Sequence, residues 1–434
     1  MLSIETNSYE ELKNYYNKVL NTDKSTYKSS NDETTPIECI EEMISKIPIE
    51  LWKREKIKIL DPCCGNGNFH LVISNELGKY DIDKKIIFEE ILKFNDINKD
   101  RLENVKKIFS NDLYNLNISN SNFLNNNDND NGNNDNDKYD LIVANPPYAK
   151  LMEDGKRTSK NHNLIKDFIE KSLSLLKSNG YLLFITPDNW MSYADRNILI
   201  EKITSLQIIH LDIHNAKKYF KKIGSSFTWY IIQNCNYYKD ITISGIWKKE
   251  VYLSVVSSQK MKFIPLLYNQ IVQSILSKTI LNSSLKKFDI RTSSYLHKYT
   301  KKELINIEET EIFKYKLIHT PKQTVYSSKP HKFQDGYKVF ISTTDKYNLI
   351  IDNCGMTQSI AFILCDSQEQ AQKYIKILYN PLYQFINNIC RWGNFNNIRI
   401  LQQFPIPDNY EDDKEIYDSF KITKDEIDYI INHL

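Results

Sequence analysis

The stretch IKILDPCCGNGNF, residues 57–69, decides the fold. Its apolar beginning is typical of a buried β-strand, and this strand ends on the carboxylate of Asp61. Gly65 and Gly67 then turn the chain, because glycine accepts backbone angles that other residues avoid and lets a ligand approach the backbone. A helix is expected to begin near Phe69, with the free N–H groups of its first turn facing the same place. Strand, glycine turn and helix together predict a βα unit with a ligand at its turn.

Three interpretations of the glycine turn are open at this point: a dinucleotide site, a plain tight turn, and a site for a nucleotide-like ligand without a pyrophosphate. The dinucleotide fingerprint has a third glycine, and here that position is His70. We therefore favour a nucleotide-like ligand without a pyrophosphate.

Short apolar stretches alternate with amphipathic helices after this turn. We expect further strands at residues 91–97, 139–144 and 180–186, and helices at 99–108 and 164–177. In the last of these, apolar residues recur every three or four positions, which leaves one apolar face to pack on a sheet. The alternation predicts a doubly wound, Rossmann-like α/β domain, with a parallel sheet between two layers of helices.

The chain divides into several segments around this domain. Its 434 residues, of which 41% are hydrophobic and 26% charged, suffice for two domains with cores of their own. The α/β domain is expected over 33–245, and its low-complexity Asn/Asp run at 117–138 should be a flexible insertion that the fold can lose. Residues 1–32 should form an N-terminal extension, 246–410 a mixed α/β second domain, and 411–434 an acidic C-terminal helix.

Composition excludes several classes of protein. No apolar run approaches the roughly 18 to 20 residues that cross a bilayer, and the N-terminus lacks the order of a signal peptide. The seven cysteines are scattered, without a C-x-x-C pair or histidines at zinc-ligand spacing, which predicts free thiols and no metal site. We expect a soluble intracellular protein, of a microbe or of the host cell of a virus, without a membrane or metal partner.

The net charge of +2 hides an uneven distribution. Residues 246–400 hold 22 Lys and Arg against 11 Asp and Glu, whereas residues 1–245 hold 32 against 35. This favours a polyanion held by the second domain, with an ordinary basic surface as the alternative. Between Ile312 and Gln334, basic residues alternate with aromatic ones and no acidic residue intervenes, which suits contact with phosphates but also occurs on solvated faces. The basic residues of this run are Lys314, Lys316, Lys322, Lys329 and Lys332.

Two further carboxylates follow the glycine turn. Asp96 ends the next expected strand, where a carboxylate can accept hydrogen bonds from two ribose hydroxyls at the carboxyl edge of the sheet. Asp112 stands after the following helix, and we expect it to accept a hydrogen bond from the exocyclic amine of the ligand's adenine ring. A surface or capping carboxylate is the alternative for both.

The most specific feature is YDLIVANPPYAK (139–150), an apolar strand that runs directly into Asn145-Pro146-Pro147-Tyr148. Two consecutive prolines fix φ and remove N–H donors, so the Asn145 amide and the backbone carbonyls are held in one geometry. An exocyclic amine on a planar ring is a poor nucleophile. Acceptance of its hydrogens by the Asn145 side-chain oxygen and the Pro146 carbonyl would favour a more tetrahedral nitrogen that can attack. A methyl sulfonium would be the electrophile, and Tyr148 would stack on a base turned out of its duplex. The alternative is an ordinary strand-ending turn.

On these residues the chain resembles the gamma class of DNA adenine-N6 methyltransferases, the TaqI and Eco57I type, over residues 33–235. The resemblance implies S-adenosylmethionine as cofactor and a flipped-out adenine of double-stranded DNA as target. TTPIECIEEM (34–43) is similar to the segment over the methionine end of the cofactor. The cofactor contacts that the resemblance implies are Thr35, Asp61, Gly65, Gly67, Asp96 and Asp112.

Two later segments extend the resemblance. YFKKIGSSFTWYII (219–232) resembles the stretch whose Phe stacks on the extruded adenine, so Phe220 is the candidate and Phe227 the substitute. A core aromatic is the alternative for both. CRWGNFNNIRILQQFPIPD (390–408) is similar to the closing segment of target-recognition domains in this group, which implies that role for the second domain.

N-P-P-Y also serves enzymes that methylate rRNA bases and the glutamine side chain of release factors. The glutamine enzymes place a helical domain before the catalytic one, and only about 30 residues precede the cofactor region here, so rRNA is the main competitor for DNA. A fused nuclease would need an extra domain, and a catalytically dead relative would need a lesion in either motif; the sequence shows neither. We expect a monomeric, site-specific DNA adenine methyltransferase that acts alone, any cognate restriction endonuclease being a separate protein.

Overall fold

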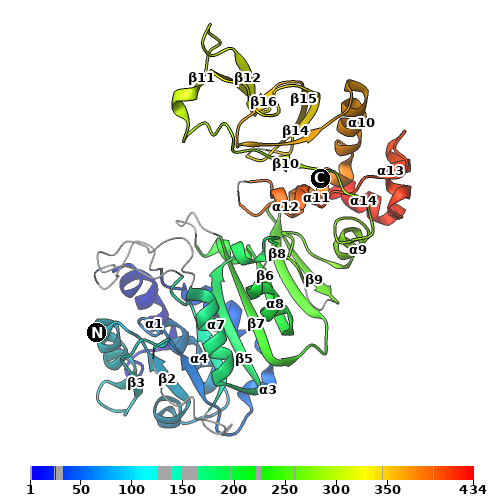
Figure 1. Ribbon diagram of the computed structural model, residues 1–434. Coiled ribbons are helices and arrows are strands. Elements are labelled where there is room, and N and C mark those ends of the chain that lie inside the picture. Colours follow the sequence, from blue (N-terminus) through cyan, green and yellow to red (C-terminus); the bar gives the residue numbers. More distant parts are fainter. Residues whose placement is uncertain are drawn as a thin grey trace. The chain divides into compact units, whose positions relative to one another are not determined.

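The computed structural model describes residues 2–23, 25, 33–125, 138–148, 164–195, 197–220, 226–257, 261–344, 346–393 and 395–434. The chain forms two compact units (Figure 1). Unit 1 consists of Met1–Asp188 and Ile198–Met261, and unit 2 of Asn189–Asn197 and Lys262–Leu434. Most of the predicted Asn/Asp insertion, residues 126–137, lies outside the described residues.

Unit 1 is built on a nine-stranded sheet with the strand order β3-β2-β1-β4-β5-β7-β6-β8-β9. The first five strands in this order run parallel, and the direction of winding reverses between β1 and β4. This confirms the doubly wound α/β fold. The strands are β1 (Ile59–Asp61), β2 (Leu92–Asn95), β3 (Asn117–Ser119), β4 (Tyr139–Ala144), β5 (Leu176–Pro187), β6 (Leu206–Ile213), β7 (Phe227–Asn236), β8 (Ile241–Trp247) and β9 (Glu250–Val256).

The sheet is mixed, whereas we expected a parallel one. β7 lies antiparallel between β5 and β6, and β9 runs antiparallel to β8. The described part of the connection from β6 to β7 holds only the short helix η6 (Asn215–Lys218). A parallel neighbour needs a crossover of a dozen or more residues, usually with a helix that packs on the sheet. The chain instead returns beside β6 in the opposite direction.

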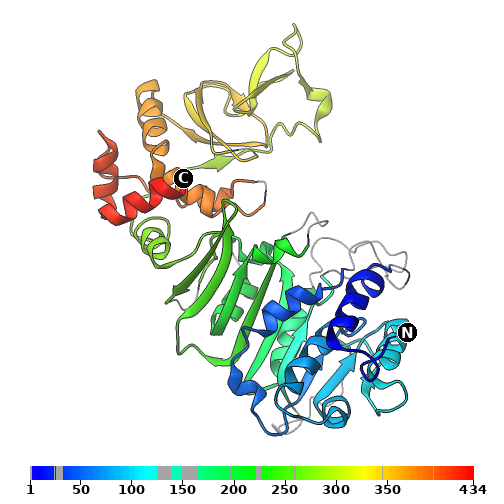
Figure 2. The same cartoon turned by 180° about the vertical axis from the view of Figure 1, so that it is seen from behind.

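Helices cover both faces of this sheet. α7 lies in front of the sheet in Figure 1, and α2 lies in front of it in Figure 2, which shows the other face. α7 buries Ile165, Phe168 and Ile169, three of the residues whose spacing predicted an apolar face. The helices are α1 (Tyr9–Tyr15), η1 (Tyr16–Leu20), α2 (Ile37–Ile44), α3 (Ile49–Trp52), α4 (Asn68–Gly78), α5 (Lys84–Ile86), η2 (Ile87–Ile91), α6 (Lys99–Val105), η3 (Lys106–Ser110), α7 (Leu164–Leu175) and α8 (Ile198–Thr204).

The N-terminal segment belongs to the core of unit 1, although we expected residues 1–32 to be an extension. Leu12, Tyr16 and Leu20 are buried in the same apolar core as β1 and β2. The Tyr16 hydroxyl also donates a hydrogen bond of 2.7 Å to the carbonyl oxygen of Asn66, inside the glycine turn. The spacing of four between these apolar residues indicates a helix with one apolar face, but it does not indicate where that face packs. Residues 26–32 of this segment lie outside the described residues.

Unit 2 has mixed α/β structure with two four-stranded sheets, ordered β10-β17-β14-β15 and β11-β13-β12-β16. Phe340 and Phe362 are fully buried at the centre of its first sheet. The strands are β10 (Arg291–Thr292), β11 (Ile305–Asn306), β12 (Tyr315–Thr320), β13 (Gln323–Ser327), β14 (Lys338–Ser342), β15 (Leu349–Asp352), β16 (Gly355–Met356) and β17 (Ile360–Leu364). The helices are η5 (Asn189–Met191), α9 (Gln270–Lys278), η7 (Lys302–Leu304), α10 (Gln368–Leu378), α11 (Pro381–Ile389), α12 (Ile398–Leu401), α13 (Asp413–Ser419) and α14 (Lys424–His433).

Two observed boundaries differ from the expected ones. The expected boundary after residue 245 falls inside β8, whose strand pairing places it in the sheet of unit 1. The acidic C-terminal segment forms two helices, α13 and α14, rather than one. Lys421, with a φ of 55°, turns the chain between them.

Within the described ranges, no helix combines the length and the apolar composition needed to span a bilayer.

Candidate active site

Three polar side chains lie where three neighbouring strands of unit 1 end. Asp61 is the last residue of β1, Asp96 directly follows β2, and Asn145 directly follows β4. β1 lies between β2 and β4, and all three strands run parallel, so these residues meet at one edge of the sheet. The winding of the chain reverses at the same place, which is where open α/β sheets bind their ligands.

The glycine turn leaves room at this edge. Gly65 and Gly67 have φ angles of +56° and +84°. A Cβ on Gly67 would stand 2.6 Å from Cε2 of Phe109, a buried core ring, so no larger residue fits there. α4 begins at Asn68 immediately after the turn, and its first N–H groups therefore face the space above β1.

Each of the two carboxylates is held by backbone N–H groups. Asp96 accepts hydrogen bonds from the nitrogens of Gly65 (2.8 Å) and Asn98 (2.7 Å), which ties the end of β2 to the glycine turn. Asp61 accepts a hydrogen bond of 3.0 Å from the nitrogen of Cys63. Burial raises the pKa of Asp61 well above its usual value; the Cys63 hydrogen bond opposes this shift and the negative charge of Asp96 adds to it. A cationic ligand group beside Asp61 would favour its ionised form.

The loop after β4 holds the Asn145 amide in one orientation. Its nitrogen donates a hydrogen bond of 2.9 Å to the carbonyl oxygen of Glu33. A carbonyl can only accept, so the amide oxygen of Asn145 must point the other way, where it accepts a hydrogen bond from the hydroxyl of Tyr148. The Asn145 carbonyl oxygen also lies 3.6 Å from the thiol sulfur of Cys63, in the glycine turn. The two motifs of the sequence thus meet.

Aromatic rings line up beside Tyr148. Its ring centroid lies 6.1 Å from that of Phe227, which in turn lies 4.6 Å from that of Phe220. Both phenylalanines are buried in the core of unit 1. The ring next to Tyr148 is therefore that of Phe227, our substitute candidate, and Phe220 lies behind it. Residues 221–225 between them lie outside the described residues.

The structure does not bring Asp112 to this place. Asp112 is exposed and precedes β3, so it lies at the amino edge of the sheet, opposite the edge where Asp61 and Asp96 lie. The segment after β3 is the one that reaches the carboxyl edge: Asn120 donates a hydrogen bond of 2.8 Å to the carbonyl oxygen of Asp96. The strand β3 was not predicted, because residues 117–119 were assigned to the low-complexity insertion.

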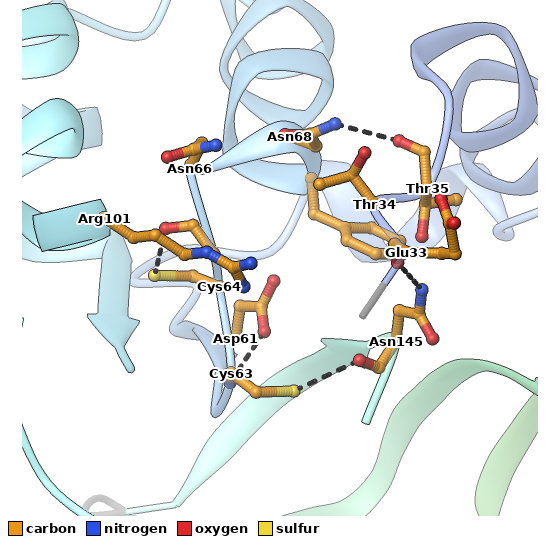
Figure 3. A pocket seen from close by; sticks show the side chains of 12 residues that line it. Glu33, Thr34, Thr35, Asp61, Cys63, Cys64, Asn66, Asn68, Arg101 and Asn145 are labelled. Atoms are coloured by element: carbon orange, nitrogen blue, oxygen red, sulfur yellow. Dashed lines mark hydrogen bonds between the residues drawn. The ribbon is translucent and has the colours of Figure 1, made fainter. Parts of the chain in front are cut away.

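A pocket with a cavity volume of about 50 Å³, partly open to solvent, lies over the glycine turn (Figure 3). Of the predicted cofactor contacts, Thr35, Asp61 and Gly65 line it, as does Asn145. The backbone carbonyl of Thr35 accepts a hydrogen bond of 2.9 Å from Asn68, which ties the segment before α2 to the start of α4. The full lining is Glu33, Thr34, Thr35, Asp61, Cys63, Cys64, Gly65, Asn66, Asn68, Phe69, Arg101 and Asn145.

Several lining residues were missed by the sequence analysis. Asn66 and Asn68 stand within and directly after the glycine turn, and their position in the motif could have indicated them. Arg101, in the first turn of α6, is 7% exposed and is the one basic side chain of this lining. Its position five residues after Asp96 is a signal only once α6 is known to begin at Lys99. Among the described residues, no group of three or more His, Cys, Asp or Glu could hold a metal ion.

The five predicted phosphate-contacting lysines all lie on unit 2. They are exposed: Lys316 lies on β12, and the other four lie in the segments before, between and after β12 and β13. Lys316 forms a salt bridge of 2.5 Å with Asp352.

Two relatives match part of this chain in sequence. The Type II methyltransferase M.VspI of Vibrio sp. (strain 343) is 25% identical over 191 residues, which make up 41% of this chain and 42% of that protein. An uncharacterized adenine-specific methylase of Mycoplasma pneumoniae is 26% identical over 174 residues, 38% of this chain and 40% of that protein. The matches therefore span less than half the length of these two relatives.

Solved structures resemble the chain over almost its whole length. The Type IIL restriction-modification enzyme MmeI, solved in complex with DNA, matches with a TM-score of 0.55 at 10% identity, over 98% of this chain and 74% of that one. The ATP-dependent Type ISP restriction-modification enzyme LlaBIII, bound to DNA, matches with a TM-score of 0.55 at 12% identity, over 98% of this chain and 41% of that one. At such identities the likeness shows a common fold.

A family sequence model identifies the family of this chain. The sequence model of the Eco57I restriction-modification methylases matches residues 3–220 of this chain. This range is half of the 434 residues and contains the glycine turn, both carboxylates at the strand ends and the Asn145 loop. The chain belongs to the Eco57I restriction-modification methylase family.

Proposed function

We propose that this protein transfers a methyl group from S-adenosylmethionine to N6 of an adenine at a specific site in double-stranded DNA, as the modification enzyme of a restriction-modification system. The observation that carries the proposal is the orientation of the Asn145 amide. Its nitrogen donates to the Glu33 carbonyl, so its oxygen, which accepts from the Tyr148 hydroxyl in the structure, is the atom that would accept a hydrogen from an amine beside the pocket.

The residues of the pocket fit the cofactor. S-adenosylmethionine, when bound, supplies an electrophilic methyl group on a sulfonium. Asp61 is buried and its pKa is raised, so the ammonium of the methionine part would stabilise its ionised form. Gly65 and Gly67 keep the backbone open to a close ligand. Asp96 accepts backbone hydrogen bonds from Gly65 and Asn98 at the carboxyl edge of the sheet, where a ribose hydroxyl would donate to the same carboxylate.

The Asn145 loop would then activate the amine. The lone pair of the adenine amine is delocalised into the ring. Two acceptors, the Asn145 side-chain oxygen and the Pro146 carbonyl, would draw the amine nitrogen toward a tetrahedral geometry. In the structure the Tyr148 hydroxyl donates to one of the two lone pairs of the Asn145 oxygen. Rotation of the Tyr148 side chain would free the acceptor and turn the ring toward a flipped-out base, with Phe220 or Phe227 as the second aromatic neighbour. The amine loses its proton after transfer, so no general base is needed.

The proposal that DNA is the target rests on the names of two relatives and on the excess of basic residues in unit 2. The two named relatives are a Type II methyltransferase and an adenine-specific methylase. We propose unit 2 as the target-recognition domain, with the exposed lysines Lys314, Lys316, Lys322, Lys329 and Lys332 toward DNA phosphates. The active form is proposed to be a monomer, and any cognate restriction endonuclease a separate protein.

The substrate can be tested directly. Protein is incubated with labelled S-adenosylmethionine and, in parallel, with duplex DNA, rRNA or protein lysate. Label should enter DNA at N6 of adenine within one sequence context, which sequencing of methylated DNA would identify. Label that enters only rRNA would establish the RNA alternative, and label that enters only protein would exclude both nucleic acids.

A further inference from the structure

Two lysine ammonium groups from different segments lie over the ring of Tyr295 in unit 2. Lys301 Nζ lies 5.3 Å and Lys329 Nζ 5.7 Å from the ring centroid. Lys301 belongs to the segment that follows Tyr295 and leads into η7, whereas Lys329 follows β13. The fold thus concentrates two positive charges that lie 28 residues apart in the sequence.

The Tyr295 ring is partly exposed, but residues on either side of it in the chain are buried. The side chain is 39% exposed, while its neighbours Ser293 and Leu296 are buried. The Ser293 hydroxyl accepts a hydrogen bond of 3.3 Å from the nitrogen of Tyr295 and lies 2.8 Å from Nε2 of His331. The His331 ring meets that of Tyr295 edge to face, with centroids 5.4 Å apart and an angle of 78°. These contacts keep the ring in place before any partner binds.

The ammonium group of Lys301 is held as well. It donates a hydrogen bond of 2.7 Å to the carbonyl oxygen of Tyr295 besides its position over the ring. In the part of the chain that the structure describes, neither Lys301 nor Lys329 has an acidic partner within 4.0 Å. Contacts of an ammonium with a ring or a carbonyl leave its full positive charge uncompensated, and a third donor hydrogen of Lys301 remains for an anion.

This environment differs from that of the other predicted lysines. Lys316 is neutralised by Asp352, and Lys314 is preceded by the exposed residues Glu308, Glu309 and Glu311. Lys332, by contrast, is exposed close to Lys329 in sequence and lies 4.9 Å from the centroid of Phe333. Positive charge without compensation is therefore concentrated around Tyr295.

We propose that Tyr295, Lys301 and Lys329 bind neighbouring phosphates of the DNA backbone. This inference rests on the proposed function, since it names the part of unit 2 that holds the substrate. The two ammonium groups over the ring disfavour stacking of a base on it, so the partner is the phosphate backbone and not an unpaired base. Tyr295 acts as a positioning residue that keeps both ammonium groups at one place.

The test is the salt dependence of DNA binding by the full-length protein. In Lys301→Gln/Lys329→Gln, which keeps most of each apolar stem, the slope of log K against log salt should become shallower by about 1.8, because each lost phosphate contact removes about 0.9. Lys373→Gln is the matched control: Lys373 is an exposed lysine of α10 in the same unit, also over a tyrosine ring, 5.8 Å from the centroid of Tyr410. Its slope should equal that of the wild type. An unchanged slope in the double variant would overturn the proposal.

A second pair of variants tests the ring. Tyr295→Phe retains the face that holds the ammonium groups and should keep the wild-type slope, whereas Tyr295→Ala should lose part of it. Equal slopes in both variants would exclude a positioning role. Circular dichroism and thermal unfolding of all these variants should match the wild type, which verifies that unit 2 is folded. A wild-type protein that neither binds nor methylates DNA would refute the proposed function itself, an outcome distinct from unchanged slopes.

Discussion

The side-chain nitrogen of Asn145 donates a hydrogen bond of 2.9 Å to the backbone carbonyl of Glu33, a residue 112 positions earlier in the chain. The segment before α2 thereby determines which end of the amide faces the substrate side of the pocket. The acceptor on the Glu33 side is a backbone carbonyl, which a substitution does not remove, so the informative change is at Asn145 itself.

Asn145→Ala should abolish methyl transfer while leaving S-adenosylmethionine binding intact. Loss of one oriented acceptor in a transition state typically costs about 10²- to 10³-fold in rate. Single-turnover rates and calorimetric binding of the cofactor would measure the two effects separately. Asn236→Ala, at the exposed end of β7, is the control and should change neither. Turnover near the wild-type rate in Asn145→Ala would contradict the assigned role.

Tyr148→Phe and Tyr148→Ala should differ strongly. The Phe variant loses the hydroxyl that occupies the Asn145 oxygen but keeps a ring for the base, so its kcat/KM should stay near or above that of the wild type. The Ala variant loses the ring, and loss of base stacking costs about 1–3 kcal/mol, or roughly 5- to 150-fold in kcat/KM. If both variants lost activity equally, the hydroxyl rather than the ring would be the essential group.

Gly67→Ala should lower both stability and cofactor affinity. Its Cβ would clash with Phe109 at 2.6 Å, and φ of +84° disfavours any side chain. Strain and overpacking of this kind cost about 1–3 kcal/mol. Gly78→Ala, at the end of α4, is a matched control because no atom lies within 4 Å of the added methyl group. We expect it to be neutral or to stabilise the protein by up to about 1 kcal/mol in thermal unfolding. Similar losses in both variants would argue against this account of Gly67.

The buried His70 should make unit 1 sensitive to acid. The side chain is fully buried and stacks on Phe94, with centroids 3.7 Å apart, and burial lowers its pKa to about 3. The unfolded chain binds the proton at a pKa of about 6.5, so the stability that neutral His70 provides is complete above this pH. It is lost as the pH falls from about 6.5 toward 3, by up to about 1.4 kcal/mol per pH unit.

Chemical unfolding between pH 7 and pH 4 would measure this loss. His70→Gln removes the titrating group and should show a shallower decline than the wild type, even if it is less stable at neutral pH. Identical pH slopes in the two proteins would show that His70 does not carry the acid sensitivity.

The active-site motifs could be predicted from the sequence because they are local. A strand, a turn that needs positive φ and a helix follow one another within residues 57–69, and β4 runs straight into Asn145. Each of Asp61, Asp96 and Asn145 was expected at the end of a strand, and they come together because parallel strands bring their carboxyl ends to one edge. The same reasoning failed for Asp112, because the short β3 at 117–119 carries no apolar pattern of its own. With β3 unrecognised, Asp112 was expected beside the ligand's adenine ring, whereas the structure places it before β3.

By itself, then, the sequence determined the doubly wound fold, the glycine turn and the loop of Asn145, since each depends on backbone preferences of a few adjacent residues. Tertiary structure decided what depends on distant pairs. It placed Tyr16 under the glycine turn, Phe227 rather than Phe220 beside Tyr148, and Lys301 and Lys329 around one ring. The physical reason is that such contacts follow from strand order and from the packing of the core, and neither leaves a periodic or local trace in the chain.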